Sequence, residues 1–528
     1  MNVQRDFGNG AGSGPLVGQG TIIDRIRDQA ARDPGRAALV TPRSVVTYGE
    51  LVGRVERLAQ VLGAAGVGAE VRCAIAVADS AEAVIAMAAV LRAGGAFLVL
   101  DPGQPVRRLH GLAESGRAEL LITTAGIAAR LALPVAGPVI DLEHLDNLPR
   151  GPVPAAVRKR SLAYVSHTSG STGSPNPVMI EHGGLRSYLE FIIADCALGP
   201  DTVSLQLAPL GYDASIRDTF APLMAGGRLV LLPRSTLLQP TAFADAVQEF
   251  SVDTLLASTP TFLTALAQDE AAAARLDGLA LIVCAGESLR PFLAAGGRTL
   301  TAGRLVNHYG PTECTITSTR YDVPARPDVT ADLIGTPVDG VLVRLLDGDL
   351  RPVPADVPGD VYIGGVGLAR GYSDRPALTA QRFIPDPYGA PGTRLYRTGD
   401  QARRRADGLL EFLGRTDWQV KIRGYRVEPA EVEGALLTHP AVTGAVVTPA
   451  TDGRGRPYLV AHVTGDLDGV TGAALRAHLA ESLPPHLMPR QFNHVARIPT
   501  TRSGKADRAA LARITSQSEQ GQSDKERP

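Results

Sequence analysis

A run of glycine and hydroxyl residues follows a predicted strand that starts at Leu162. Small residues let backbone N–H groups converge on an anion, and hydroxyls add further donors, so such a loop can hold phosphate groups. It is not a Walker A loop, since no Gly-Lys-Ser/Thr sequence follows, and a Ser/Gly-rich surface loop is the alternative interpretation. The candidate phosphate ligands are Thr168, Ser169, Gly170, Ser171, Thr172 and Gly173.

A second candidate site follows another predicted strand, in the sequence Asn307-His308-Tyr309-Gly310-Pro311-Thr312-Glu313. A tyrosine on a rigid turn can stack on a base, and the carboxylate of Glu313 can hold Mg²⁺. An ordinary Gly-Pro turn has the same residue types, so for this motif by itself both interpretations stay open.

Two further stretches place a charged residue next to glycine. Asp400 ends the stretch 396–400 and can accept hydrogen bonds from ribose hydroxyls, although aspartate is also common in plain turns. Lys505 follows a glycine near the C-terminus, where a solvated surface lysine is the alternative. Only four of the 53 basic residues are lysines, so a lysine that remains can mark a position that needs a compact ammonium group.

The composition excludes several classes of protein. The chain has 528 residues, of which 44% are hydrophobic and 20% are charged, so it can bury a sizeable core. Its formal net charge of −1 gives no electrostatic footprint for nucleic acid or an anionic membrane. The four cysteines form no CxxC pair, which disfavours a zinc site or a disulfide framework. Since no signal peptide or unbroken apolar span is apparent, we expect a soluble cytoplasmic protein.

The elements that would position these residues alternate between strands and helices. Strands are predicted at 71–77, 97–100 and 120–123, and helices at 81–91 and 106–115 lie between them. This β-α-β-α-β order implies a parallel, doubly wound sheet. The alternation returns later in the chain, with strands at 252–257 and 279–284 on either side of a helix at 261–268.

The pattern changes in the last third of the chain. From about residue 333 to 422, short strands are separated by Gly, Pro and Asp turns. After Asp417, an α+β domain of ~100 residues is predicted, with helices at 429–438 and 471–482 and strands at 441–448, 457–463 and 492–497. We expect four regions: a disordered tail at 1–19, a core at 20–416, a C-terminal subdomain at 417–513 and a second disordered tail at 514–528.

Together these motifs resemble the adenylate-forming superfamily, and most closely the adenylation domains of nonribosomal peptide synthetases. The resemblance covers nearly the whole chain, because further matches occur in the family's order at 47–51, 91–98, 212–215, 359–363, 369–372, 414–424 and 483–489. It implies an α/β fold with a large N-terminal domain of doubly wound sheets, a β-rich subdomain and a small mobile α+β C-terminal domain.

The resemblance also implies an activity. Such enzymes use ATP and Mg²⁺ to join a carboxylate to AMP with release of pyrophosphate, and then pass the acyl group to a thiol. By the match, residues 168–173 hold the β- and γ-phosphates, Glu313 holds the metal, and Lys505 bridges the carboxylate and the α-phosphate. Asp417 resembles the hinge about which the C-terminal subdomain swings between the two half-reactions. The matched nucleotide ligands are Tyr309 for the adenine, Gly310 and Thr312 beside it, and Asp400 and Arg415 for the ribose.

The substrate pocket can be matched in the same way. Asp213 resembles the family's aspartate that pairs with the α-amino group of an amino acid. Because a buried cation such as Arg217 needs a partner, a polar or acidic substrate side chain is favoured. If Arg217 instead pairs with Asp218 or with solvent, the pocket is small and apolar. His308 with aliphatic neighbours also suits a proline-like substrate. A β-amino acid is a further alternative. The matched lining residues are Ala214, Arg217, Ala257, Val283, Ala285, His308, Ile316 and Thr317.

The partner expected from the sequence is a carrier protein. No carrier module follows Lys505 and no condensation domain precedes residue 20, so we expect a free-standing enzyme that loads a separate phosphopantetheinylated carrier. A small activator protein is a further candidate partner.

The sequence departs from the family's pattern at one place in the phosphate loop. It has Pro175-Asn176-Pro177 where the family usually has Pro-Lys-Gly, so a lysine beside the phosphates is missing. An acyl- or aryl-CoA ligase is one alternative function, and the departure at Asn176 keeps a catalytically weak nucleotide-binding scaffold as another.

Overall fold

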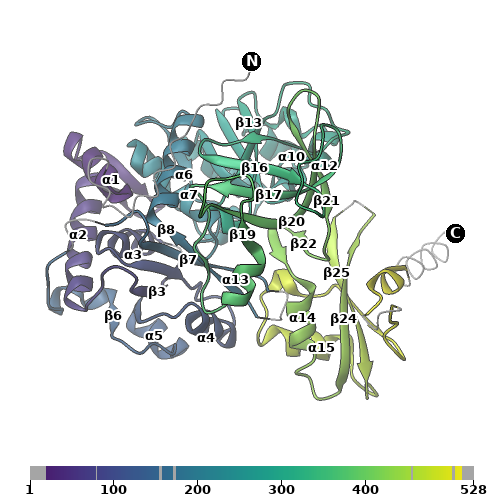
Figure 1. Ribbon diagram of the computed structural model, residues 1–528. Coiled ribbons are helices and arrows are strands. Elements are labelled where there is room, and N and C mark those ends of the chain that lie inside the picture. The colour runs from purple at the N-terminus through teal and green to yellow at the C-terminus, as the bar shows by residue number, and fades with distance from the viewer. Residues whose placement is uncertain are drawn as a thin grey trace. The chain divides into compact units, whose positions relative to one another are not determined.

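The computed structural model describes residues 20–78, 80–153, 157–170, 174–453, 456–501 and 506–513. Contacts within the chain divide it into two units, and Figure 1 labels many of their helices and strands. The first unit takes the described residues up to 102, then 112–167 and 177–414, and the second takes 103–111, 168–176 and the residues from 415 onward. Across these described ranges, no helix combines the length and apolar character needed to cross a membrane.

The first unit contains a seven-stranded sheet in the order β18-β8-β7-β4-β3-β5-β6. The pairs between β4, β3, β5 and β6 are parallel, and so is the pair between β7 and β4, which confirms the predicted doubly wound pattern. The predicted elements between residues 71 and 123 are also confirmed, and their ends move by one residue at most. The bounds are β3 (Arg72–Ala76), α3 (Ala81–Arg92), β4 (Ala96–Val99), α4 (Val106–Ser115), β5 (Leu120–Thr123), α5 (Ala125–Leu131), β6 (Val139–Asp141), β7 (Leu162–Thr168), β8 (Asn176–Glu181) and β18 (Gly371–Tyr372).

A larger sheet of 14 strands completes the first unit. At its middle, β11 (Thr254–Ser258), β12 (Leu281–Ala285) and β13 (Arg304–Tyr309) run parallel, and α10 (Pro260–Ala267) connects the first two. Four strands of only three or four residues, which the sequence pattern does not identify, extend one side of the sheet. They are β9 (Val203–Leu205), β10 (Arg228–Val230), β1 (Ala37–Val40) and β2 (Val45–Thr47).

The β-rich segment of the chain continues this sheet on its other side. β15 (Leu333–Pro337) pairs antiparallel with both β14 (Thr319–Asp322) and β21 (Leu410–Arg415), and so joins the two parts. Gly335 makes this pairing possible, because its φ is +77° and a Cβ there would lie 1.8 Å from the carbonyl oxygen of Arg320. The sheet then continues through β20 (Arg394–Arg404), β17 (Gly359–Gly365) and β16 (Val341–Leu346), with β19 (Phe383–Pro385) beside β20.

Helices that are buried on all sides connect the core of the first unit. In α3 every residue except Glu82 and Arg92 is buried, and in α7 (Ala214–Ala225) every residue from Ser215 onward is buried. A helix that is buried all round must be covered on both faces. One core cluster joins these helices with residues of both sheets and of α1 (Ile22–Arg32), α2 (Tyr48–Ala64) and α6 (His182–Asp195).

The four cysteines are part of this buried interior. Cys73, Cys196, Cys284 and Cys314 are all buried, and none of them forms a disulfide. Burial raises the pKa of the Cys196 thiol to about 12, and it also raises the pKa of the Cys73 and Cys284 thiols well above the ordinary value.

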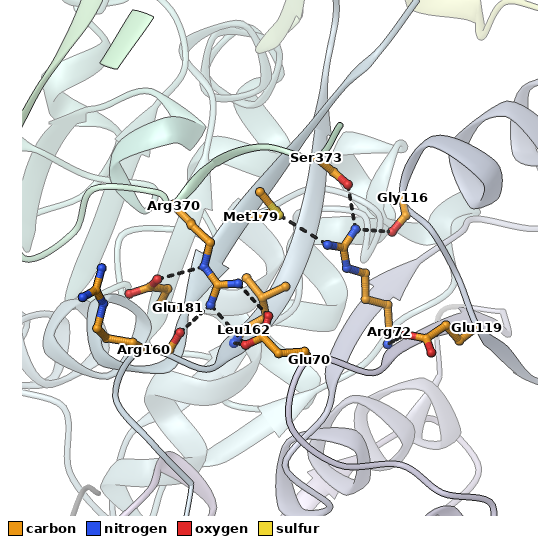
Figure 2. Close-up of polar contacts among 10 residues, drawn as sticks. All are labelled: Glu70, Arg72, Gly116, Glu119, Arg160, Leu162, Met179, Glu181, Arg370 and Ser373. Atoms are coloured by element: carbon orange, nitrogen blue, oxygen red, sulfur yellow. Dashed lines mark hydrogen bonds and ion pairs between the residues drawn. The ribbon is translucent and has the colours of Figure 1, made fainter. Parts of the chain in front are cut away.

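A polar cluster, shown in Figure 2, fixes the edge strand β18 to the seven-stranded sheet. The guanidinium of Arg370 donates to Glu70 at 2.6 Å and to Glu181 on β8 at 3.0 Å. Arg72, the first residue of β3, donates to the Oγ atom of Ser373 at 2.7 Å. Because Arg370 and Ser373 flank β18, the two arginines hold this short strand in place from both ends.

The second unit has the α+β order that the sequence predicts. Its sheet pairs β24 (Val442–Thr451) antiparallel with β25 (Pro457–Gly465), which pairs parallel with β26 (Gln491–His494). The helices α14 (Pro429–Leu436) and α15 (Gly472–Ala480) share a buried cluster with these strands and with the hairpin β22–β23 (Val420–Ile422, Tyr425–Val427).

The other helices of the described residues are short. They are α8 (Arg234–Leu237), α9 (Pro240–Glu249), α11 (Glu270–Ala273), α12 (Arg290–Ala294), α13 (Pro376–Arg382) and the 3₁₀ helices η1 (Leu142–Asn147), η2 (Gly297–Leu300), η3 (Thr312–Cys314) and η4 (Pro485–Leu487).

Acidification should destabilise the second unit through His486. Its ring stacks on Tyr425 with the centroids 4.1 Å apart, and burial, together with the charges of Arg108 and Arg423, lowers the pKa of His486 to about 3. A histidine whose pKa is lower in the folded state favours unfolding as the pH falls from ~6.5 toward 3. Between pH 7 and 5 we expect the free energy of unfolding to fall by up to about 2 kcal/mol, measured by denaturant titration of the fluorescence of Trp418.

The matched variant for this prediction is His486→Phe. Phenylalanine keeps an aromatic ring against Tyr425 but cannot take up a proton, so its free energy of unfolding should change less between the two pH values. An equal loss in the variant and in the wild-type protein would assign the pH dependence to another group.

Candidate functional site

The carboxyl ends of β11, β12 and β13 meet at one edge of the larger sheet. Ala285 on β12 lies in register with His308 on β13, and Ser258 on β11 lies in register with Cys284 on β12. In sheets of this kind, ligands bind beyond the carboxyl ends of the parallel strands. The structure thus brings four of the predicted pocket residues to adjacent strand ends: Ala257, Val283, Ala285 and His308.

The loop after β13 is closed tightly at this edge. A Cβ at Gly310 would lie 2.6 Å from the carbonyl oxygen of Ile316, so the loop depends on glycine at that position. Thr315 and Ile316 both have positive φ values, +56° and +73°, a conformation that β-branched residues rarely adopt. Strained backbone of this type is concentrated at functional sites, and here it presents Ile316 and Thr317, two of the predicted pocket residues.

Two of the predicted nucleotide ligands touch each other. The hydroxyl of Tyr309, at the end of β13, donates to Oδ2 of Asp400 on β20 at 2.5 Å. The backbone N–H of Asp400 donates to Oγ1 of Thr398 at 2.9 Å, which fixes the turn around it. The motifs predict both residues as nucleotide ligands. They do not predict that Tyr309 and Asp400, which are 91 positions apart in the sequence, contact each other.

Glu313 is the candidate metal ligand, and it is fully buried. Its Oε1 atom accepts a hydrogen bond from the hydroxyl of Tyr372 on β18 at 2.8 Å. Mg²⁺ is usually held by one or two carboxylates, substrate phosphates and water, and a single oriented carboxylate fits that donor set. Among the described residues, no group of three or more His, Cys, Asp and Glu could hold a metal without such a substrate.

The glycine and hydroxyl loop is partly described. The hydroxyl of Thr168, at the end of β7, is buried and has no hydrogen-bond partner among the described residues, whereas Ser169 donates to the carbonyl oxygen of Arg426 at 2.8 Å. A Cβ at Gly170 would lie 1.8 Å from the carbonyl oxygen of Ser174, so the turn requires glycine. A buried hydroxyl without a partner beside a tight glycine turn fits a phosphate ligand. The predicted residues Ser171, Thr172, Gly173 and Lys505 lie outside the described residues.

A buried asparagine, Asn176, occupies the position where the resemblance predicts a lysine. Asn176 is the first residue of β8, and its side-chain Oδ1 atom has no hydrogen-bond partner in the described part of the chain. Its amide nitrogen lies near the position that a Cβ of Gly170 would take. A neutral amide therefore lies next to the glycine turn, at the position where the resemblance predicts a lysine.

Asp213 links the pocket to the nucleotide motif. It lies immediately before α7, close to the side chain of Thr312 and to the N–H of Ala214. Burial raises the pKa of Asp213, and these two neighbouring groups oppose the rise. No ion pair joins Asp213 to a cation among the residues that the structure describes, so a positively charged ligand group would find a carboxylate there.

Arg217 is the largest fully buried side chain described, with 1% exposure. Its Nη1 atom donates to Nδ1 of His308 at 3.2 Å, and the oxygens of Tyr188 and Thr317 lie 3.4 and 3.5 Å away. All three acceptors are neutral groups. Within the described ranges, Arg217 forms no ion pair with a carboxylate and its Nε atom has no hydrogen-bond partner.

The pairing of Arg217 with Asp218, which the sequence leaves open, is absent from the described structure. One carboxylate oxygen of Asp218 accepts hydrogen bonds from the N–H groups of Leu207 and Ala208 at 2.9 and 3.0 Å. Burial raises the pKa of Asp218 to about 7, although the charge of Arg217 opposes the rise. Consecutive residues on a helix point in different directions, which explains why these two neighbours do not meet.

His308 is neutral in this arrangement. Burial, together with the charges of Arg217, Arg320 and Arg304, lowers the pKa of His308 far below its ordinary value. Because Nδ1 accepts a hydrogen bond from Arg217, we assign the ring proton to Nε2. Nε2 is buried and has no hydrogen-bond partner in the described part of the chain.

Two residues of the site are not predicted as site residues: Tyr188 has no signal in the sequence, and Tyr372 lies in the matched segment 369–372 without a predicted role. Tyr188 on α6 contacts Arg217 and Thr317, and Tyr372 contacts Glu313. A buried tyrosine on an amphipathic helix has the same pattern as an ordinary core residue, so only the three-dimensional contact identifies it.

In the second unit, the predicted ribose ligand Arg415 and the predicted hinge Asp417 form a two-point ion pair, with N···O distances of 2.7 and 2.9 Å.

Comparisons with known proteins give consistent matches along the chain. A family model described as AMP-binding enzyme matches residues 26–373, and a second, AMP-binding enzyme C-terminal domain, matches residues 431–505. The chain is 37% identical over 497 residues to a dimodular nonribosomal peptide synthase of Bacillus subtilis (strain 168), and 40% identical over 505 residues to phosphinothricin tripeptide synthetase PhsC of Streptomyces viridochromogenes. Each alignment covers 93% of this chain, but only 21% and 45% of the respective relative.

A solved structure is similar over nearly the same range. It is a nonribosomal peptide synthetase protein containing adenylation and PCP domains, bound to a vinylsulfonamide inhibitor. The TM-score is 0.80 at 27% sequence identity, and the match covers 94% of this chain and 84% of that one.

Replacing Arg217 with methionine should stabilise the protein without ligand. A buried guanidinium that faces only neutral acceptors loses its hydration without gaining an ion pair, and an apolar side chain of similar length avoids that cost. We expect the free energy of unfolding of Arg217→Met to rise by about 1–2 kcal/mol in denaturant titrations at pH 7.

The matched control is Arg186→Met on α6. Arg186 is also buried, but it is paired with Glu190 at 2.7 Å, so its loss should lower the free energy of unfolding by about 1 kcal/mol. If Arg217→Met destabilises the protein as Arg186→Met does, the neutral acceptors compensate the buried charge and the argument is wrong.

Proposed function

Because the chain belongs to the AMP-binding enzyme family, we propose that it catalyses the ATP-dependent adenylation of an amino acid with release of pyrophosphate. The observation that carries this proposal is the position of Asp213, whose carboxylate lies close enough to Thr312 for that side chain to lower its pKa. Asp213 is the proposed ligand of the substrate α-ammonium group, and Thr312 belongs to the proposed nucleotide motif. Their proximity supports a reaction between an amino acid and a nucleotide at one edge of the sheet.

The binding of an amino acid would stabilise the carboxylate of Asp213. Burial raises the pKa of Asp213, and an ammonium beside it would lower that pKa again and gain a charge-assisted hydrogen bond. Carboxylic acids without an amino group would gain nothing from this contact. Asp213 thus favours an amino acid over the aryl and acyl acids of a CoA ligase.

The nucleotide side of the reaction is assigned to separate groups. ATP supplies pyrophosphate as a leaving group, and Mg²⁺ neutralises negative charge while it is bound. Thr168, Ser169 and Gly170 would donate to the phosphates together with Ser171, Thr172 and Gly173, and Glu313 would orient the metal. Tyr309 would pack on the adenine beside Gly310, with Asp400 and Arg415 on the ribose. Lys505 would bridge the substrate carboxylate and the α-phosphate with its ammonium group.

The substrate side chain is proposed to be acidic or polar. Arg217 brings a charge into a pocket whose other proposed lining residues are mostly small or aliphatic: Ala214, Ala257, Val283, Ala285 and Ile316, with Thr317 and His308 as the polar members. A substrate carboxylate, as in aspartate or glutamate, would supply the anion that the described residues around Arg217 do not.

The acceptor in the second half-reaction is proposed to be the phosphopantetheine thiol of a separate carrier protein. The solved relative that contains PCP domains beside its adenylation domain supports a carrier in place of free coenzyme A. Asp417 is proposed as the hinge between the two half-reactions, and its ion pair with Arg415 would connect that hinge to the nucleotide. A small activator protein is a further proposed partner.

The proposed function predicts ATP–pyrophosphate exchange that depends on an amino acid. The assay covers the proteinogenic amino acids, several dicarboxylic and β-amino acids, and aromatic and fatty acids as comparisons. We expect exchange with an acidic or polar amino acid. Exchange with proline or a small apolar amino acid would keep the adenylation and overturn the proposed side-chain class. Exchange with aromatic or fatty acids alone would indicate a CoA ligase, and bound ATP without any exchange would indicate a scaffold.

Lys505→Ala should separate the two half-reactions. Loss of the ammonium removes the contact proposed to bring carboxylate and α-phosphate together, so we expect pyrophosphate exchange to fall by at least ~100-fold. Transfer of preformed aminoacyl-AMP to a carrier should change little. The matched control is Lys159→Ala, an exposed lysine outside the proposed site, which should keep both reactions. Equal loss of both half-reactions in Lys505→Ala would refute the assignment.

A further inference from the structure

A tyrosine outside the proposed pocket lining holds the guanidinium of Arg217. Tyr188 on α6 is 6% exposed, and its hydroxyl oxygen lies 3.4 Å from Nη1 of Arg217 and 3.2 Å from Oγ1 of Thr317. We infer that Tyr188 is a positioning residue that gives the site its selectivity for a negatively charged substrate side chain, an inference that rests on the proposed function.

The direction of each hydrogen bond follows from the chemistry of the groups. A guanidinium has donors only, so the oxygen of Tyr188 accepts from Arg217. The hydroxyl proton of Tyr188 is then available for Oγ1 of Thr317, which lies in the strained loop after β13. His308 accepts at Nδ1 from the same Nη1 atom at 3.2 Å. Tyr188, Thr317 and His308 thus fix one end of the guanidinium through neutral acceptors.

This arrangement leaves donors for a ligand. Nε of Arg217 and Nε2 of His308 are both buried, and neither has a hydrogen-bond partner among the described residues. Buried donors without partners are rare in proteins, because each has lost its hydration. A substrate carboxylate offers several lone pairs and a negative charge, whereas the amide of asparagine or glutamine offers one acceptor oxygen and no charge. The acidic substrate should therefore be preferred over its amide.

The contact with Tyr188 adds to the helix geometry that separates Arg217 from a competing carboxylate. Asp218 follows Arg217 directly, and its Oδ1 atom is buried without a hydrogen-bond partner in the described part of the chain. A guanidinium released by Tyr188 could turn toward this oxygen and form an internal ion pair. The pocket would then have no net positive charge to offer, and an acidic side chain would lose its advantage over the neutral amide.

The test is Tyr188→Phe, measured by pyrophosphate exchange with the preferred acidic amino acid and with its amide. In the wild-type protein we expect kcat/KM for the acid to exceed that for the amide by at least ~10-fold. Tyr188→Phe should lower this ratio by ~10-fold, through a higher KM for the acid, while the KM for ATP stays unchanged. In an Arg217→Met background, Tyr188→Phe should have no further effect on the ratio.

The matched control is Tyr48→Phe. Tyr48 is fully buried in the same unit, but its hydroxyl donates to the carbonyl oxygens of Leu223 and Gly227 at 2.9 and 2.8 Å. It should lower the stability of the protein without changing the ratio of acid to amide. An unchanged ratio in Tyr188→Phe, or an equal change in Tyr48→Phe, would overturn the inference.

Failure of the proposed function gives a different result. If no amino acid supports exchange in the wild-type protein, the adenylation proposal fails, and the selectivity inference fails with it. The positioning contact itself is then read from urea denaturation. The midpoint shift caused by Tyr188→Phe should disappear in the Arg217→Met background, and an unchanged shift would overturn the contact as well.

Discussion

The parallel register of β11, β12 and β13 is the constraint on which the candidate site depends. Because the three strands run in the same direction, their carboxyl ends bring residues separated by tens of positions to one edge. The loop after β13 turns back at that edge through Gly310 and two β-branched residues with positive φ. Helix α7 then begins beside it, so that Asp213 lies near Thr312 and Arg217 donates to His308.

The buried polar groups of the site lower the stability of the first unit, whereas its apolar core raises that stability. The large core is formed by apolar helices such as α3 and by both sheets, whereas the site buries a guanidinium, a neutral histidine and several hydroxyl groups without full hydrogen bonding in the described residues. Such groups raise the free energy of the empty site and lower the free energy of a complex that completes their hydrogen bonds. Buried polarity is thus what makes the site receptive to a ligand.

Local pattern predicted a large part of this architecture. The helix at 106–115 and the strand at 120–123 agree with the structure at both ends, because their apolar periodicity and their flanking turns lie within a short window. The joining of the β-rich segment to the larger sheet was not predicted, because it depends on β15 pairing with strands on both sides. Similarly, motifs indicated Arg217 and His308 as pocket residues, but Tyr188 meets Thr317 across 129 positions of sequence and leaves no local signal.

The burial of the four cysteines makes this chain suitable for thiol labelling. The thiolate is the reactive form, and burial raises the pKa of Cys73, Cys196 and Cys284, so native thiols should react slowly with maleimide dyes. Cysteines introduced at exposed positions, for example at Arg351 in the first unit and Leu437 in the second, would then carry a fluorescent donor and acceptor. Energy transfer between the two dyes would report the distance between the units in single molecules before and after ATP, an amino acid or the proposed carrier protein is added.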